Sequence, residues 1–109
     1  MLSRRKYERF SLALPCDISH TFEVFAGETV DISMNGSKIS IWDDRAISVL
    51  LVGESCQIHF KTDWGEVILD ADILRIVDSE FFQVSTRFHA IDKHSEMILQ
   101  RMIRKLQRG

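Results

Sequence analysis

The sequence predicts a mainly β domain: a six-stranded antiparallel barrel with one C-terminal helix and a flexible N-terminal arm. Three observations lead to this fold class. Apolar and polar residues alternate along six segments, the hydrophobic period becomes helical only after residue 92, and 109 residues suffice for one modest core. Strands joined by turns, with no helical pattern between them, favour a curled antiparallel sheet. We therefore expect one domain over residues 1–109, with the arm at 1–9, the barrel at 10–90 and the helix at 92–108.

The first strand follows an arm that is polar, basic and without an apolar period. Its inward face is expected to carry Phe10, Leu12, Leu14, Cys16 and Ile18. Pro15 falls on the outward phase and cannot donate to a ladder, so the strand should border an edge there. In the second strand, Val30 and Ile32 are expected to point into the core. Asp31 and Ser33 would then lie side by side on the outer face.

Gly36 is expected to supply the turn into the third strand, because a residue without Cβ adopts a positive φ freely. Residues 43–52 fit either a helical turn or a short strand. The long fifth strand slips in phase near Ile73 and Leu74, which predicts a bulge or a strand covered on both faces. After the sixth strand, Asp92 is the expected N-cap of a helix whose apolar stripe should cover an open end of the barrel.

Charge is concentrated at the two ends of the chain. Residues 1–10 hold four basic groups and one acid, residues 93–109 hold five and one, and residues 11–92 hold five basic and fourteen acidic groups. An anionic partner is therefore expected to meet the ends. The basic face of the final helix consists of Arg101, Arg104, Lys105 and Arg108. It fits a wet surface placed favourably in the helix dipole, or a docking face for a protein or nucleic acid.

Several classes of protein receive no support. Cys16 and Cys56 lie forty positions apart on apolar strand phases, which indicates small buried residues and no disulfide framework. The N-terminus lacks the apolar core of a signal peptide, and the longest apolar run, 46–52, is too short to span a bilayer. We thus expect a cytoplasmic protein with no membrane insertion. The histidines and carboxylates form no catalytic triad or metal spacing, so we expect no enzyme, metal or cofactor.

Two polar clusters carry the candidate chemistry. The first is Arg4, Arg5 and Arg9 in the arm, and the second is Asp31, Ser33 and Gly36. Guanidinium groups bind phosphate oxygens and the O6/N7 edge of guanine two bonds at a time, and a carboxylate beside a hydroxyl accepts from the opposite guanine edge. Taken singly, the first cluster also fits a solvated basic terminus and the second ordinary turn chemistry.

In this order the clusters form R-x-x-x-R, at Arg5 and Arg9, followed by D-x-S-x-x-G, from Asp31 through Ser33 to Gly36. The chain thereby resembles the PilZ family over essentially its whole length. The resemblance implies a six-stranded split barrel that binds the bacterial second messenger cyclic di-GMP. It implies these ligand-binding residues: Arg4, Arg5, Arg9, Asp31, Ser33 and Gly36. Family members with an additional arginine before R-x-x-x-R tend to bind two intercalated ligands, and because Arg4 holds that position, we expect an intercalated dimer.

The arm suggests a mechanism. A polar arm without an apolar anchor should be disordered without ligand, and phosphate contacts would draw it over the Asp31 face to form a surface for an effector protein that the sequence does not identify. The first alternative is an interaction module on the same fold that does not bind nucleotide. The second is a small-barrel nucleic-acid binder, which is disfavoured because most phenylalanines fall on the inward phase and the barrel is acidic.

Overall fold

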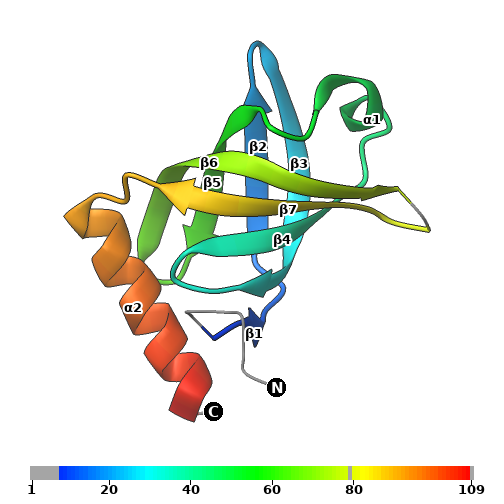
Figure 1. Cartoon of the computed structure of the whole chain (residues 1–109). Helices are drawn as coiled ribbons and strands as arrows, with labels where there is room; N and C mark the ends of the chain where they lie inside the picture. The colour runs from blue at the N-terminus through cyan, green and yellow to red at the C-terminus, as the bar shows by residue number, and fades with distance from the viewer. Residues whose placement is uncertain (1–7, 79, 109) are drawn as a thin grey trace, which may run out of the picture.

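The computed structural model describes residues 8–78 and 80–108, and its elements are arranged as Figure 1 shows. Seven strands and two helices form within these ranges. The strands are β1 (Phe10–Ser11), β2 (Pro15–His20), β3 (Glu23–Ile32), β4 (Gly36–Ile41), β5 (Ser55–Thr62), β6 (Gly65–Asp78) and β7 (Phe82–His89). The helices are α1 (Ala46–Val49), which resolves the undecided segment 43–52 as a helical turn, and α2 (Lys93–Arg108).

Six of the strands close into an antiparallel barrel, as the sequence predicts. The pairing order is β3-β2-β5-β6-β7-β4, and β4 pairs back with β3. Strand β1 is a further short strand that pairs with the last two residues of β3. The inward residues of the strands form one continuous core, which includes Phe25, Phe60 and Ile58, all fully buried. The barrel therefore gives the ends of β1, β3 and β4 a rigid base.

The predicted first strand is interrupted. Strands β1 and β2 both pair with β3, but residues 12–14 between them leave the regular ladder. Thr29 of β3 replaces the missing bonds: its Oγ1 accepts from the Leu14 backbone N–H at 2.8 Å and donates to the Leu12 carbonyl oxygen. A threonine side chain that acts as both donor and acceptor can satisfy two backbone groups at once. The linker thus stays attached to the barrel although its strand is broken.

The predicted orientation of Val30, near the end of β3, is wrong, whereas that of Ile32 is confirmed. The pairing of β3 with β4 shifts register between Thr29 and Asp31, which marks a bulge. An extra residue reverses the alternation of side chains, so Thr29 is buried and Val30 is exposed, whereas Ile32 returns to the core. The predicted phase slip of the fifth strand is confirmed: β6 and β7 shift register between Ile73 and Arg75.

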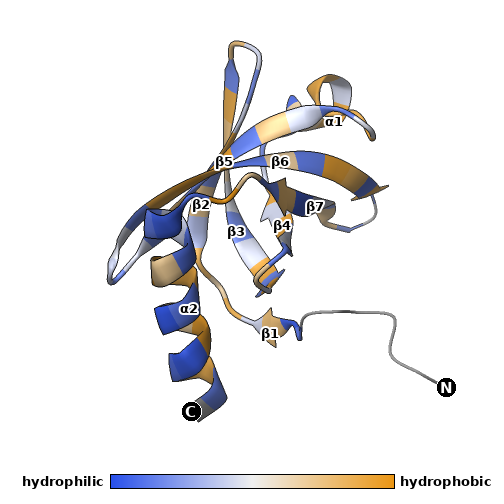
Figure 2. Ribbon diagram, turned by 60° about the vertical axis from the view of Figure 1, so that its left-hand side comes forward, coloured by the Kyte–Doolittle hydropathy of each residue, from blue (hydrophilic) through white to orange (hydrophobic). Residues whose placement is uncertain are grey.

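Helix α2 covers one end of the barrel, as predicted. Its N-cap is Asp92, whose Oδ1 accepts from the Ser95 backbone N–H at 2.8 Å. Hydrogen bonds from the side chain and the backbone of Ser95 hold the pKa of the Asp92 carboxyl below its ordinary value. Buried residues on one side of the helix, Ile98, Leu99 and Met102, join the barrel core. Figure 2 shows this apolar side turned toward the strands. Within the described ranges, neither helix has both the length and the apolar character that crossing a bilayer requires.

Candidate functional site

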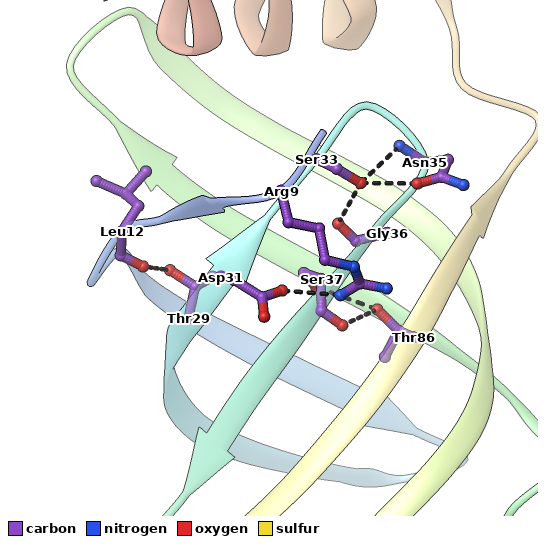
Figure 3. Close-up of polar contacts among 9 residues, drawn as sticks. All are labelled: Arg9, Leu12, Thr29, Asp31, Ser33, Asn35, Gly36, Ser37 and Thr86. Carbon is purple, nitrogen blue, oxygen red and sulfur yellow. Dashed lines mark hydrogen bonds and ion pairs between the residues drawn. The ribbon is translucent and has the colours of Figure 1, made fainter. Parts of the chain in front are cut away.

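The short strand β1 brings the two sequence motifs together. Its pairing aligns Phe10 with Ile32 and Ser11 with Asp31, so Arg9, one residue before β1, lies beside the end of β3. There Arg9 Nη1 donates to Asp31 Oδ1 at 2.8 Å, as Figure 3 shows. The two side chains are only 23% and 20% exposed. A charge-assisted bond of this length in a partly desolvated position is stronger than a surface ion pair.

The Arg9–Asp31 pair leaves binding capacity on both partners. Within the described residues, Arg9 uses one of its N–H groups and Asp31 uses one of its two carboxylate oxygens. A guanidinium carries five N–H donors, and a carboxylate accepts at both oxygens. The pair therefore holds both groups in fixed positions while a ligand can still reach the remaining donors and the second oxygen.

Ser33 does not lie beside Asp31 on the outer face, which corrects the sequence prediction. It is fully buried within the β3–β4 turn, because β3 ends at Ile32 and the chain leaves the strand before Ser33. Its Oγ lies 2.7 Å from Asn35 Oδ1, to which it donates, and it accepts from the Asn35 backbone N–H at 3.3 Å. Its backbone N–H donates to the Gly36 carbonyl oxygen at 2.9 Å. Ser33 thus organises the turn that follows Asp31.

Gly36 is required by close packing and not by a left-handed backbone, so the predicted reason for this glycine is wrong. The glycines with positive φ in the described chain are Gly53 and Gly65. Gly36 is the first residue of β4 and pairs with Arg87 of β7. A Cβ at Gly36 would lie 2.3 Å from the Thr86 carbonyl oxygen, a distance that real Cβ atoms do not adopt. The absence of a side chain lets β4 and β7 approach at the point where the motif ends.

Buried hydroxyls fix the same junction one residue further on. Ser37 Oγ and Thr86 Oγ1 lie 3.1 Å apart, and Thr86 Oγ1 also donates to the Ser37 carbonyl oxygen at 3.2 Å (Figure 3). Both side chains are buried. Ser37 and Thr86, like Thr29, are polar residues at inward-facing strand positions. A polar residue at such a position is the signal by which the sequence could identify them. They hold the base of the site and do not reach its surface.

Positive charge extends from Asp31 across the outer face of the barrel. The register places Lys38 of β4 opposite Asp31, Ser85 of β7 opposite Lys38, and Arg75 of β6 opposite Ser85. The neighbours of these residues on β4 and β7, Ile39 and Val84, are buried, so the row faces outward. With Arg9, the row carries three cations and one carboxylate. The predicted site contains neither Lys38 nor Arg75, and the strand register is the observation that places both in line with Asp31.

Two of the predicted site residues, Arg4 and Arg5, lie outside the described residues. Cys16 and Cys56 are buried free thiols, as predicted, and burial raises their pKa to about 12 and about 11. A thiol with such a pKa remains protonated at neutral pH and is a poor nucleophile. Within residues 8–78 and 80–108, no group of three or more histidine, cysteine or acidic side chains is placed to hold a metal ion.

The fold and the site define a small β-barrel whose N-terminal segment is joined by an arginine to the acidic end of a neighbouring strand. A family model described as the PilZ domain matches residues 3–105. The chain therefore belongs to the PilZ domain family, as its motifs predict. A comparison with curated proteins found no match.

Solved structures show the same fold. The PilZ domain of Escherichia coli YcgR with c-di-GMP has a TM-score of 0.82 and 24% identity over 97% of this chain and 93% of that one. The Bacillus subtilis inhibitor of motility, MotI/DgrA, has a TM-score of 0.81 and 21% identity over 99% of this chain and 53% of that one. The K. pneumonia MrkH–c-di-GMP complex has a TM-score of 0.78 and 19% identity over 96% and 53%. The chain thus spans about half the length of MotI/DgrA and MrkH.

Proposed function

We propose that this PilZ domain is a non-enzymatic cytoplasmic receptor for cyclic di-GMP, which it binds on the outer face where Arg9 meets Asp31. The observation that carries the proposal is the ion pair itself, because it unites two motifs that lie 22 residues apart in the sequence at a distance of 2.8 Å. Family membership supports it, as does the likeness in fold to YcgR and MrkH structures that contain c-di-GMP.

In this proposal, Arg9 and Asp31 contact different parts of the ligand. The free N–H donors of Arg9 bind a phosphate of the ligand in a bidentate manner, and the second oxygen of Asp31 accepts from the N–H edge of a guanine. The turn at Ser33 and the close strand contact at Gly36 keep Asp31 in place. Ser33 and Gly36 therefore contribute to binding by positioning Asp31 and not by contacting the ligand. A preorganised site loses less conformational entropy on binding.

The remaining cations fit a ligand larger than one nucleotide. Arg4 and Arg5 belong to the same arm as Arg9 and supply guanidinium groups for further phosphates. Lys38 and Arg75 extend positive charge along the outer face away from Asp31. We therefore propose that the ligand is an intercalated pair of cyclic di-GMP molecules, whose phosphates are shared between the arm and the barrel.

The output of the receptor is a contact with an effector protein. When phosphates bind Arg4, Arg5 and Arg9 together, the arm is drawn over the Asp31 face, and the covered face presents a surface that the free domain does not have. NMR spectra of the chain with and without cyclic di-GMP test this step. Backbone amide signals of residues 2–9 that do not shift on nucleotide addition would contradict it.

Calorimetric titration with cyclic di-GMP tests the receptor proposal. Arg9→Ala should weaken binding by at least about tenfold, because a charged hydrogen bond contributes about 1.5–3 kcal/mol. Asp31→Ala should weaken it less, since it removes contacts to a neutral base. Arg104→Ala on α2 is the matched control and should leave the affinity unchanged. Absence of binding heat from the wild-type chain at high micromolar nucleotide would refute the proposal.

One observation favours a second function. The Arg9–Asp31 pair is partly buried and joins the residue before β1 to the end of β3, so it also fits a structural clamp that fastens β1 to the barrel. In that case the domain is an interaction module whose surface does not depend on nucleotide. Both functions predict that Arg9→Ala destabilises the domain, but only the receptor predicts heat on addition of cyclic di-GMP.

A further inference from the structure

An apolar groove lies between α2 and the start of the barrel, on residues that the nucleotide site does not use. It has a volume of about 380 Å³, and its lining includes Leu12, Leu14, Trp64, Met102 and Leu106. Leu12 and Leu14 come from the β1–β2 linker, Trp64 from the β5–β6 turn, and the others from the second half of α2. A groove of this size with an aromatic wall is typical of a pocket that accepts a bulky apolar group.

A basic hollow adjoins the groove. It has a volume of about 330 Å³ and is lined by Trp64, Arg101, Arg104 and Lys105. Trp64 and Lys105 line both hollows, and Lys105 Nζ lies over the Trp64 ring, 5.4 Å from its centroid. The three cations are exposed, and none forms an ion pair within residues 8–78 and 80–108. Apolar and cationic binding positions therefore lie next to each other on one surface.

We propose that this surface docks an acidic segment of a partner protein that inserts one bulky apolar side chain beside Trp64 and places carboxylates against Arg101 and Arg104. An apolar groove next to a cationic rim determines which kind of partner can bind. An apolar groove alone does not specify a charge. Here one carboxylate of the lining, Asp63, faces three cations that form no ion pair within the described residues, and this excess of positive charge favours a negatively charged ligand and disfavours a positive one. If the domain relays a nucleotide signal, as proposed above, this surface gives the effector a second contact that forms without nucleotide, in addition to the nucleotide-dependent contact at the Asp31 face.

Charge argues against the other occupants. The N-terminal residues of this chain include Arg4, Arg5 and Lys6, which the cationic rim would repel. Nucleic acid would satisfy the cations, but its phosphates do not fill an apolar groove. Binding of successive bases uses several aromatic side chains, whereas Trp64 is the single aromatic residue in the lining of these two hollows. A second copy of the domain presents an acidic barrel body, but part of its negative charge is already paired with a cation or a histidine, as in Lys61–Asp17 and His89–Asp72.

The experiment selects a peptide and then measures its binding. A random peptide library is selected on the wild-type chain and counter-selected on the Arg101→Glu/Arg104→Glu variant, with nucleotide absent. A selected peptide is then titrated against a Trp42→Phe chain, in which Trp64 is the only tryptophan and reports occupancy by its fluorescence. Lys93→Glu, an exposed charge reversal in the first turn of the same helix, is the matched control.

We expect selected peptides to combine Asp or Glu with at least one bulky apolar residue and to shift the Trp64 emission. Arg101→Glu/Arg104→Glu should weaken binding by about tenfold or more, and Lys93→Glu by less than about twofold. The double variant should keep its thermal midpoint and its affinity for cyclic di-GMP, which separates failure at this surface from failure at the nucleotide site. Four results would each overturn the proposal: no enrichment, basic peptides, a Trp64 shift with single-stranded DNA in place of peptide, or self-association of the wild-type chain that the double variant abolishes.

Discussion

Arg9, beside the barrel, and the three exposed cations of helix α2 are held in opposite ways. Arg9 is 23% exposed and donates to Asp31 at 2.8 Å, on a strand junction fixed by buried hydroxyls and by a glycine. Arg101, Arg104 and Lys105 are exposed on one side of α2 and form no ion pair within the described part of the chain. Arg9 is thus paired with a carboxylate and held in one orientation, whereas the three helix cations are exposed to solvent and have no carboxylate partner in the described part of the chain.

This difference separates two kinds of recognition. A paired and partly buried guanidinium is weakly screened by salt and offers donors in one fixed geometry, which suits a small rigid ligand. Exposed cations act over a longer range, are strongly screened and adapt to partners of varied shape. The net charge of the protein does not distinguish the two groups, because it counts each arginine equally.

The largest expected effect concerns the junction of β4 and β7, next to the Arg9–Asp31 pair. Gly36→Ala would place a methyl group 2.3 Å from the Thr86 carbonyl oxygen, so β4 and β7 must separate. We expect the free energy of unfolding to fall by about 3 kcal/mol, at the upper end for overpacked sites. Gly53→Ala is the control: its φ is +93° and nothing lies within 4 Å, so it carries only backbone strain, about 1–2 kcal/mol. Urea unfolding of both variants measures the two losses of unfolding free energy. Equal losses would show that the junction is not tightly packed.

A smaller effect is expected from the ion pair itself. Arg9→Ala leaves a partly buried carboxylate without its partner, and Asp31→Ala leaves the guanidinium, so each should lower the free energy of unfolding by about 1 kcal/mol. The double variant should lose less than the sum, with a coupling of about 0.5–1 kcal/mol. The measurement is a double-mutant cycle by urea unfolding at low and high salt. Additive losses would mean that Arg9 and Asp31 do not interact in solution, and the contrast with α2 would disappear.

The fold could be predicted because strand alternation reports directly which side chains are buried. It gives the inward faces of β2, β4 and β7, and the phase slip at Ile73 and Leu74 gives the bulge of β6. The switch to a helical period after Asp92 gives α2. These features are local, so a window of a few residues contains the information that determines them.

The site could be predicted in composition but not in geometry. Thr29, Val30 and Asp31 fit an unbroken strand as well as a bulged one, and the bulge is favoured because Thr29 satisfies backbone groups of a linker fifteen or more positions away. The role of Gly36 depends on β7, fifty positions later in the chain. Such contacts between distant segments leave no periodic signal, so the sequence identifies the residues but not what each of them touches.

The smallest expected effect concerns the stability contributed by the exposed cations of α2. Arg101→Ala and Arg104→Ala remove exposed side chains that form no ion pair within the described residues, so each should change the free energy of unfolding by less than about 0.5 kcal/mol. The change should fall toward zero at high salt, because exposed charges are strongly screened, whereas the coupling between the partly buried Arg9 and Asp31 should largely persist. Urea unfolding at two salt concentrations measures both. A stabilising change larger than about 0.5 kcal/mol at low salt would still fit the contrast, because relief of repulsion among Arg101, Arg104 and Lys105 on one helix face requires that these charges be unpaired. A destabilising change well above about 1 kcal/mol would contradict it, since an exposed cation gains no more than about that from the helix dipole, and the excess would mean that the helix cations are bound to carboxylates as Arg9 is.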